Sequence, residues 1–477
     1  MTKQKRRNSQ MTEQAVQIII TIKLGDESRE VAQSLEIEEL EGGIASLNQS
    51  LQVSLAGMVL EMLDARIHQA RPKTWRSLGT AKRSLLTEFG EIHFRRHVYL
   101  DERGERITPL DRLLNLPPYA RNSKKVEAMG ACLAAESSYR QAARLLSYAI
   151  KQELSPSTLC RMVRRVGRKV QAWEAEEQAP GKVRAPLLYC EADGVYLHLQ
   201  REARKKAEVK VGIFYTGKTA IAENRYRCEH KVATCQLGLS TRDWQVHLRE
   251  LAFRHYNFDT VKLAVVGGDG ADWVQNSFEL LELPSVHLLD RFHVVRSLKR
   301  AYASVLNISE LAKTLFAKGF EAIAPQLEAG FAKPGTPLRK RQSETYAYLS
   351  AHQDSLTSLD HRGLPYSFAS LGAMEGNVDK LVRQRMRGRG QSWSLAGAQS
   401  MLAVLRHKDL IQSRAFLFQP LVQPRRHSVN RPVKRAAPKW TPTTYSIPAF
   451  SGPSASQSWV QLLKRQLNDS LSINTFF

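Results

Sequence analysis

Residues 261–293 read VKLAVVGGDGADWVQNSFELLELPSVHLLDRFH, and this stretch decides the fold. It opens with an apolar, β-branched run of the length of a buried strand, and the run ends in Gly-Gly-Asp-Gly. Such a strand places the carboxylate of Asp269 at its carboxyl edge, where open α/β sheets carry their chemistry. A second short strand over residues 286–289 then leads to Asp290 and His293. The alternative is that Asp269 is only a turn residue or a helix cap, because Asp-Gly is a common turn signal.

An upstream stretch, residues 185–200, has the same design and reads APLLYCEADGVYLHLQ. We expect a strand over residues 187–190 that is interrupted at Asp193 and resumes over residues 195–199. A carboxylate inside an apolar strand is costly unless it is paired or holds a metal ion. Two such aspartates therefore predict a shared acidic site in which carboxylate oxygens hold a pair of divalent cations.

The order of the predicted elements favours one α/β fold. Strands over residues 208–215 and 231–239 follow the strand that carries Asp193, and an amphipathic helix follows over residues 241–256. With the strand at 261–266 and the segment that ends at Asp290, the order is βββαβαβα. This is the order of the ribonuclease-H-like fold, in which the first and fourth strands carry the first two metal-binding carboxylates.

Such a core needs a third acid from a later helix. A charged, helical insertion is expected over about residues 309–365, and a further helical pattern begins at Glu375. An acid beside a positive stripe is what a metal site acting on a phosphate backbone needs. The rival third acid is Asp379, and the alternative role for Glu375 is a helix cap. The basic residues of the stripe are Arg383, Arg385 and Arg387.

Residues 122–180 predict a helix-turn-helix region. Helices are expected over residues 125–135, 138–150 and 155–170, and the last of them begins with Ser-Pro-Ser, a favourable start for a helix. The last two helices are joined by a short connection, as in a helix-turn-helix. The third helix suits a recognition helix in a DNA major groove, although a helical bundle with a solvated basic face is the alternative. Its basic residues include Arg161, Arg164, Arg165 and Arg168.

The remaining segments complete four predicted regions. Residues 1–121 are expected to form an N-terminal region with a short strand at 18–22, one or two helices over 37–69 and a β-hairpin region over 85–99. The predicted catalytic domain spans residues 185–410. The basic, Pro- and Ser-rich tail, residues 420–477, lacks the apolar surface to offset chain entropy, and we expect it to be largely disordered.

The composition points to an anionic partner. The chain of 477 residues has 70 Lys and Arg against 46 Asp and Glu, a formal net charge of +24, which favours nucleic acid or an anionic membrane surface. No apolar run approaches the roughly 20 residues that span a bilayer, and no signal peptide is recognisable. We therefore expect a cytoplasmic, nucleoid-associated protein without a membrane partner. The five cysteines do not form a disulfide framework, and Cys228, His230 and Cys235 lack a fourth zinc ligand at a standard spacing.

Over about residues 75–410 the chain resembles the bacterial insertion-sequence transposases of the ISLre type, long catalogued as an uncharacterised family and related to Mutator-like enzymes. The motifs are specific together, and each would be weak alone. They are EADG at 191–194, GDGADW at 268–273, LDRFH at 289–293, GAMEGN at 372–377 and RMRGRGQSW at 385–393. From Pro420 onward the chain departs from the usual end of the family.

The resemblance implies DNA cleavage and strand transfer by a DDE triad with two Mg²⁺ (or Mn²⁺) ions. The triad maps to Asp193, Asp269 and Glu375, which would bind the metal ions. His293 matches a histidine of the Mutator-like relatives and, with Asp290, is a possible accessory residue. The implied partners are the terminal inverted repeats of the element and target DNA, bound by a homodimer or a higher assembly.

Two other classes of protein share parts of this pattern. A ribonuclease-H-like nuclease without transposition would carry the same carboxylates and would cut DNA without joining the ends to a target. A non-catalytic helix-turn-helix protein would bind DNA and ignore Mg²⁺. In the transposase interpretation Asp193 would bridge both metal ions, and Asp269 and Glu375 would bind one each.

Overall fold

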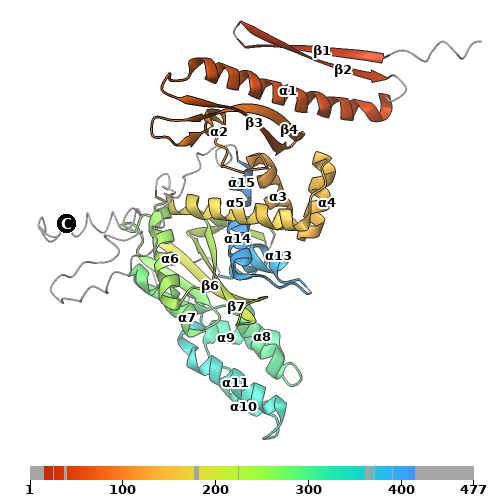
Figure 1. Cartoon of the computed structure of the whole chain (residues 1–477). Coiled ribbons are helices and arrows are strands. Elements are labelled where there is room, and N and C mark those ends of the chain that lie inside the picture. The colour runs from red at the N-terminus through yellow and green to blue at the C-terminus, as the bar shows by residue number, and fades with distance from the viewer. Residues whose placement is uncertain are drawn as a thin grey trace, which may run out of the picture. The chain divides into compact units, whose positions relative to one another are not determined.

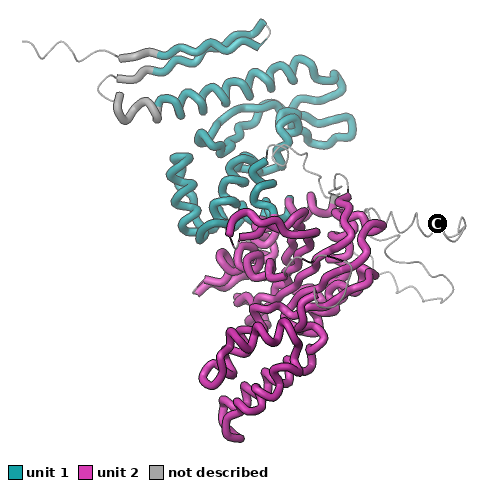
Figure 2. The backbone as a smooth tube through the Cα atoms, turned by 180° about the vertical axis from the view of Figure 1, so that it is seen from behind, with its two compact units in different colours: residues 1–169, 407–434 teal, residues 170–406, 435–477 magenta. Residues whose placement is uncertain are grey.

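The computed structural model describes residues 15–24, 26–36, 40–176, 182–223, 225–359, 366, 368, 371–388 and 390–413. Figure 1 shows the chain with many of its elements labelled. The tail predicted over residues 420–477 lies outside the described residues. The described chain forms two compact units, shown in different colours in Figure 2. Unit 1 holds the described residues up to 169 and those from 407 to 413, and unit 2 holds those from 170 to 406. No helix in these described ranges is long and apolar enough to cross a membrane.

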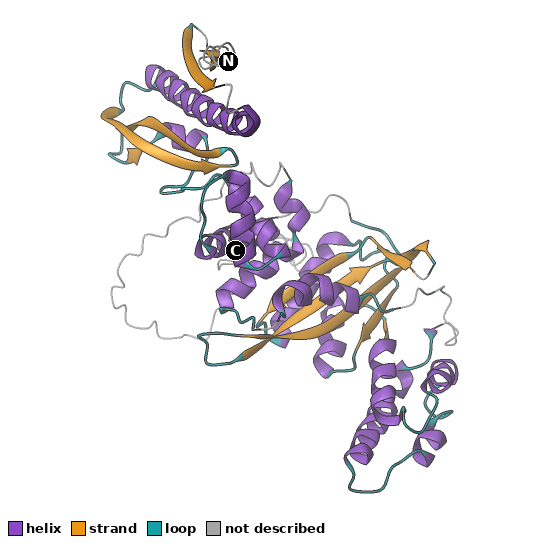
Figure 3. Cartoon of the chain, turned by 90° about the vertical axis from the view of Figure 1, so that its right-hand side faces the viewer, coloured by secondary structure: helices purple, strands orange, loops and turns teal. Residues whose placement is uncertain are grey.

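In unit 1, the long helix α1 (Leu40–Ala70) has strands on two sides, as Figure 3 shows. Helix α1 contacts both β2 and β4, and the apolar residues Leu51 and Met62 on it are buried. The predicted strand at 18–22 is thus confirmed. The helix predicted over 37–69 is confirmed from Leu40 onward, with 37–39 outside the described residues, and the glycines at 42–43 do not divide it. The pairing partner of the first strand was not predicted. The elements are β1 (Ala15–Leu24), β2 (Glu27–Glu36), α1 (Leu40–Ala70), β3 (Arg76–Thr87), β4 (Gly90–Leu100) and β5 (Arg106–Ile107).

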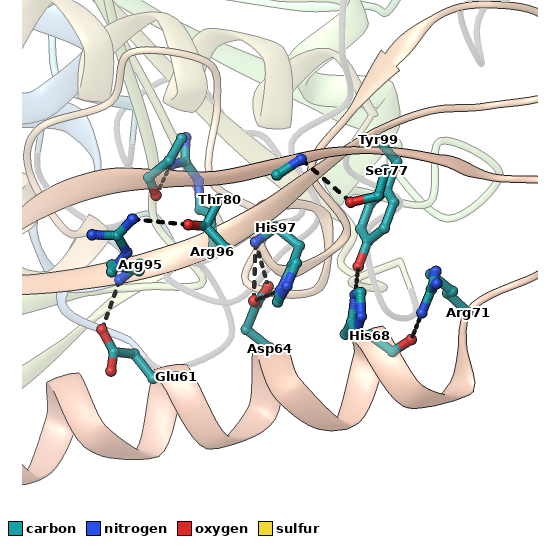
Figure 4. A network of polar contacts seen from close by, with 12 residues as sticks. Glu61, Asp64, His68, Arg71, Ser77, Thr80, Arg95, Arg96, His97 and Tyr99 are labelled. Carbon is teal, nitrogen blue, oxygen red and sulfur yellow. Dashed lines mark hydrogen bonds and ion pairs between the residues drawn. The ribbon is translucent and has the colours of Figure 1, made fainter.

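A polar network joins α1 to β4 (Figure 4). The buried carboxylate of Asp64 accepts hydrogen bonds from the backbone N–H of His97 at 2.9 and 3.1 Å, and His97 Nδ1 lies 2.6 Å from Asp64 Oδ2. One turn along the helix, His68 Nδ1 lies 2.7 Å from Tyr99 Oη. The rings of His68 and His97 stack with their centroids 4.0 Å apart. Helix and sheet are therefore held by specific polar contacts in addition to apolar packing.

The histidine stack predicts that unit 1 loses stability in acid. Burial lowers the pKa of His68, as do His97 and Arg71, while Asp64 raises it. A folded pKa below the unfolded one means that protonation favours unfolding, so stability is lost as the pH falls below the ordinary histidine value of about 6.5. We expect the melting temperature of the full chain to fall between pH 7.5 and 5.5, and His68→Gln to reduce this fall.

The matched control for this prediction is His93→Gln, which changes an exposed histidine on β4, the strand of His97. The control should keep the pH dependence of the unaltered chain. An unchanged pH dependence in His68→Gln would show that the stack does not set the acid sensitivity.

The three helices predicted over residues 122–180 are present. Ser123 Oγ accepts from the N–H of Val126 at 3.2 Å, and Ser138 Oγ accepts from that of Gln141 at 3.2 Å, so a serine caps each of the first two helices. Lys151, in the left-handed conformation with φ of 51°, ends the second helix. The helices are α2 (Pro109–Leu113), α3 (Lys124–Glu136), α4 (Tyr139–Ile150), α5 (Pro156–Glu176) and α15 (Lys408–Gln412), of which α15 contacts α3.

Unit 2 is a mixed α/β unit built on a five-stranded sheet with the order β10-β7-β6-β11-β12. Strands β6, β7 and β10 are antiparallel neighbours, and β11 and β12 run parallel to β6. The predicted interruption at Asp193 is wrong, because Asp193 and Gly194 pair with Val211 and Lys210 of β7 in a continuous ladder. The strands are β6 (Leu187–His198), β7 (Lys206–Tyr215), β10 (Val232–Leu237), β11 (Leu263–Gly268) and β12 (Ser285–Leu289). A hairpin that the sequence did not predict, β8 (Gly217–Ala222) with β9 (Arg225–Glu229), lies between β7 and β10 in the chain.

Helices cover both faces of this sheet (Figure 3). On one face, alternate residues of β6 such as Cys190 and Ala192 pack with Trp244 and Phe278 in a buried apolar cluster. On the other face lie the helices that follow residue 371, since α12 contacts β6 and β7 and α14 contacts β10. The elements are α6 (Thr241–His255), α7 (Asp272–Gln275), the 3-10 helix η2 (Asn276–Leu281), α12 (Met374–Val378) and α14 (Leu395–Arg406).

The predicted insertion is helical in its described residues, and it has its own core. Leu298, Tyr302, Leu311 and Leu349 are buried in one cluster that joins α8 to the later helices. The helices are α8 (Arg291–Tyr302), α9 (Ile308–Lys318), α10 (Ala324–Ala329) and α11 (Pro337–Ala351).

Candidate functional site

Neighbouring parallel strands bring Asp193, Asp269 and Asp290 to one edge of the sheet. Continuing the pairing of β11 with β6 by two residues places Asp269 opposite Asp193. Continuing the pairing of β12 with β11 by one residue places Asp290 opposite Asp269. Asp193 lies on the face of β6 that α12 covers, and Asp269 and Asp290 directly follow β11 and β12 at the same end of the sheet. The last pairs in the two ladders are Gly267 with Glu191 and Gly268 with Leu289.

Asp193 is the buried member of this row, with 8% of its surface exposed. Burial raises the pKa of Asp193, and the nearby charge of Asp269 raises it further. A hydrogen bond of 2.7 Å from the N–H of Gly194, and the charges of His293 and Arg383, act in the opposite direction. A carboxylate in this setting is stabilised by any cation that approaches it.

Asp269 is half-buried and begins the loop after β11. Its Oδ1 accepts from the N–H of Ala271 at 3.0 Å, so the cap role considered for it is also present. Its carbonyl oxygen accepts from Tyr348 Oη of helix α11 at 2.7 Å. The helical insertion is thereby fixed to the loop that carries the second predicted acid.

Asp290 is buried and serves the helix that follows it. Its Oδ1 accepts from the N–H of Phe292 at 2.8 Å and so caps α8, while its Oδ2 lies 3.3 Å from His293 Nδ1. This contact raises the pKa of His293, burial opposes the rise, and the charges of Asp193 and Asp269 add to it. The contact with Asp290 and the charges of the other two aspartates therefore favour the protonated form of His293.

Glu375 lies in the first turn of α12 and is connected to Asp193 through Arg383. The Nη1 of Arg383 contacts Glu375 Oε1, and its Nη2 lies 4.0 Å from Asp193 Oδ2. Helix α12 continues through a π-helical turn, η5 (Asp379–Arg383), into α13 (Gln384–Met386). In a regular α-helix, positions eight residues apart differ by roughly 80°, and one π turn reduces this offset to roughly 20°. The π turn thus directs Arg383 back toward Glu375.

The other arginines of this helix differ in exposure. Arg385 is 6% exposed, and its guanidinium lies 5.0 Å from the centroid of the Trp393 ring. The predicted DNA contact does not fit this burial, whereas Arg387 is exposed. Asp379, the rival third acid, accepts a hydrogen bond of 2.7 Å from Gln384 Nε2.

In unit 1, the arginines predicted to contact DNA lie on α5. Arg161 and Arg168 are exposed, and Arg164 is half-buried. Arg165 Nε donates to Glu127 Oε1 at 2.6 Å, so this arginine is held by helix α3. Arg161 and Arg168 are thus the members of the predicted set that offer an exposed charge.

The site has the donor chemistry of a divalent metal site, although its side chains do not form a closed cluster. Within the described ranges, no group of three or more His, Cys, Asp or Glu side chains is arranged to hold a metal ion. Carboxylate oxygens are the ligands that Mg²⁺ and Mn²⁺ prefer. The guanidinium of Arg383 stands between Asp193 and Glu375, so a positive charge is already shared by these two carboxylates.

Two further acids near the site were missed as functional candidates. Burial raises the pKa of Glu208 on β7, the charge of Lys210 lowers it, and the charges of Asp269 and Asp193 raise it, so Glu208 lies within electrostatic range of both aspartates. Glu191 is 2% exposed and lies two residues before Asp193, on the same face of β6. Both stand in apolar strands, which is the signal that identified Asp193.

Comparisons with known proteins give one family. The model of an uncharacterised protein family, UPF0236, matches residues 30–414. A Streptococcus gallolyticus protein, described as the UPF0236 protein in the vanSb 3′ region, is 24% identical over 391 residues, or 78% of this chain and 83% of the relative. The solved Drosophila P element transposase strand transfer complex is 11% identical and covers 62% of this chain and 80% of its own, with a TM-score of 0.26. A TM-score this low does not establish a common fold. Because the family model spans most of the sequence, the chain belongs to the uncharacterised protein family UPF0236.

Proposed function

We propose that the chain is a DDE-type DNA transposase with a ribonuclease-H-like catalytic core. It would cleave DNA at the ends of an insertion sequence and join them to target DNA by metal-dependent phosphoryl transfer. The observation that carries the proposal is that Asp193 lies on β6 and Asp269 directly follows the adjacent parallel strand β11, with Glu375 connected to Asp193 through Arg383. The strand order supports the proposed core, because the first strand of the sheet, β6, is central, with the antiparallel strand β7 on one side and the parallel strand β11 on the other.

In this proposal Asp193, Asp269 and Glu375 would hold Mg²⁺ or Mn²⁺. When bound, two such ions activate the attacking water or 3′-hydroxyl and stabilise the leaving oxygen. The protein's own residues do the rest. Arg383 keeps Glu375 and Asp193 together, and Asp290 orients His293, whose positive charge would attract the phosphate backbone.

The experiment that tests the function uses DNA that carries the sequences flanking the gene. The purified chain is incubated with this labelled DNA and a target plasmid, in Mg²⁺ or in a chelator. We expect cut ends and strand-joined products in Mg²⁺ only. Cutting without joining would indicate a nuclease, and binding that is indifferent to Mg²⁺ would indicate a regulator.

DNA binding by α5 gives a separate prediction. Replacing both exposed arginines, Arg161→Glu with Arg168→Glu, should weaken binding to the element ends about tenfold or more, since phosphate contacts supply much of the affinity. The slope of log affinity against log salt should fall by about one for each phosphate that the variant no longer neutralises. Fluorescence anisotropy at several salt concentrations measures both quantities.

The control for this prediction is Lys333→Glu with Lys340→Glu, which makes the same change of charge at exposed positions of the helical insertion. If both double variants weaken DNA binding equally, the loss of affinity comes from the change in net charge and not from a contact of α5. Unchanged DNA binding in the α5 variant would show that these arginines do not contact DNA and that α5 has a structural role only.

A further inference from the structure

The buried carboxylate of Glu191 binds the start of the helix that carries Glu375. It accepts a hydrogen bond from Tyr215 Oη at 2.8 Å and sits among three consecutive backbone N–H groups. These are the N–H groups of Gly372, Ala373 and Met374, which donate at 3.2, 3.3 and 3.4 Å. A carboxylate at this place satisfies donors that a helix start leaves unpaired, and its charge favours the positive end of the helix.

The neighbouring strand is shaped to admit this contact. A Cβ atom at Gly267 would lie 3.2 Å from Glu191 Cγ and 2.6 Å from Leu371 Cδ1. The second distance is shorter than real Cβ contacts allow, so a side chain at Gly267 would force the end of the Leu371 side chain to move. The glycine opposite Glu191 therefore leaves room over β11 for the side chains of Glu191 and Leu371.

Apolar packing alone would not require an acid here. Burial raises the pKa of Glu191, and the hydrogen bonds of Tyr215, Gly372 and Ala373 act against this rise. Burying a carboxylate costs free energy of desolvation. Its hydrogen bonds, however, fix the relative position of the segments that they join more narrowly than apolar contacts do. Here that geometry concerns the helix start at Glu375 and the strand that carries Asp193.

We propose that Glu191 is a positioning residue that sets the place of Glu375 relative to Asp193. One carboxylate holds the first turn of α12, two residues along β6 from Asp193. The consequence for metal binding rests on the proposed function, whereas the mechanical connection between β6 and α12 does not.

The first arm of the test measures the connection itself by hydrogen–deuterium exchange on the full chain. Glu191→Gln keeps the size of the side chain but replaces one of the two acceptor oxygens by an NH₂ group, which cannot accept a hydrogen bond from the backbone N–H groups. We expect the amides of residues 372–378 to exchange about tenfold faster, while those of β6 stay unchanged. Unchanged exchange at these amides would overturn the proposal.

The second arm measures the Mg²⁺ concentration that gives half of the metal-induced rise in melting temperature. We expect Glu191→Gln to need about tenfold more Mg²⁺ and saturating Mg²⁺ to restore most of the cleavage rate. Faster exchange with an unchanged midpoint would overturn the positioning role. A chain without any response to Mg²⁺ and without cleavage would contradict the proposed function. Hydrogen–deuterium exchange would still show whether Glu191 holds the start of α12.

Two controls separate positioning from charge and from stability. Glu208→Gln removes an acid within electrostatic range of Asp193 and leaves the hydrogen bonds between Glu191 and the start of α12 in place. An equal shift of the Mg²⁺ midpoint in this variant would overturn positioning, because charge alone would explain it. Thr234→Val removes a buried hydrogen bond of 2.8 Å to His247 and should lower stability without moving the midpoint. If Glu191→Gln does not fold, Glu191→Asp, which keeps the charge on a shorter side chain, should give the same changes in smaller measure.

Discussion

Asp193→Asn is expected to lower the rate of Mg²⁺-dependent DNA cleavage on the order of 10³-fold while DNA binding and the fold are retained. The amide keeps the shape of the side chain and removes the charge that a metal ion needs. Stability should not fall. Burial raises the folded pKa of Asp193 above its unfolded value, so ionisation opposes folding once the pH exceeds the unfolded pKa. The variant should therefore melt at or above the temperature of the unaltered chain at pH 7, and the difference should shrink as the pH is lowered.

The matched control is Asp272→Asn, which changes an exposed aspartate in the first turn of α7, three residues beyond Asp269. It should cleave at close to the unaltered rate. Full cleavage by Asp193→Asn would remove Asp193 from the site. A large loss of stability in that variant would identify the carboxylate as a structural group.

Local signals explain why many elements were predictable. The apolar run at 286–289 became β12, and the helix predicted at 125–135 became α3, which Ser123 caps. Apolar periodicity and helix-capping residues depend only on residues close together in the sequence, so the sequence alone predicts these elements. The helix at 241–256 and the strand at 208–215 follow the same reasoning.

Elements that depend on distant pairing were harder to predict. The hairpin of β8 and β9 has few apolar residues, and its ladder includes an irregularity near Ala222. Asp193-Gly194 was expected to break its strand because the pair is a turn signal. Pairing with β7 overrides that local preference.

The candidate site shows the same division. Asp193 and Asp269 were identified from short motifs, and the parallel register places them opposite each other. The contacts of Glu191 join residues more than 180 positions apart, and no local pattern encodes them. The burial of Arg385 under Trp393 likewise depends on how the chain returns after the π turn.

Glu174→Gln is expected to destabilise unit 2 by about 3–5 kcal/mol, because it leaves a buried cation without its partner. The side chain of Arg406 is 3% exposed. Its Nε and Nη2 donate to the two oxygens of Glu174 at 2.9 and 2.8 Å, and its Nη1 donates to the carbonyl oxygen of Cys235 at 2.7 Å. This fork joins the end of α14 to β10 and to the last turns of α5. Urea denaturation of the full chain should show an earlier transition for the residues of unit 2.

The exposed ion pair of the insertion supplies the contrast for this last prediction. Lys340 and Glu344 lie 4.0 Å apart with side chains 80% and 63% exposed, so Glu344→Gln should change stability by less than about 0.5 kcal/mol. Both substitutions remove one carboxylate from one pair, and burial is the main difference between them. Equal effects would mean that water reaches Arg406 in solution and that the fork does not hold α14 to the sheet. A large effect of Glu174→Gln alone would show that the contacts of α14 contribute strongly to the stability of unit 2. Helix α14 packs on the same face of the sheet as α12, which carries Glu375.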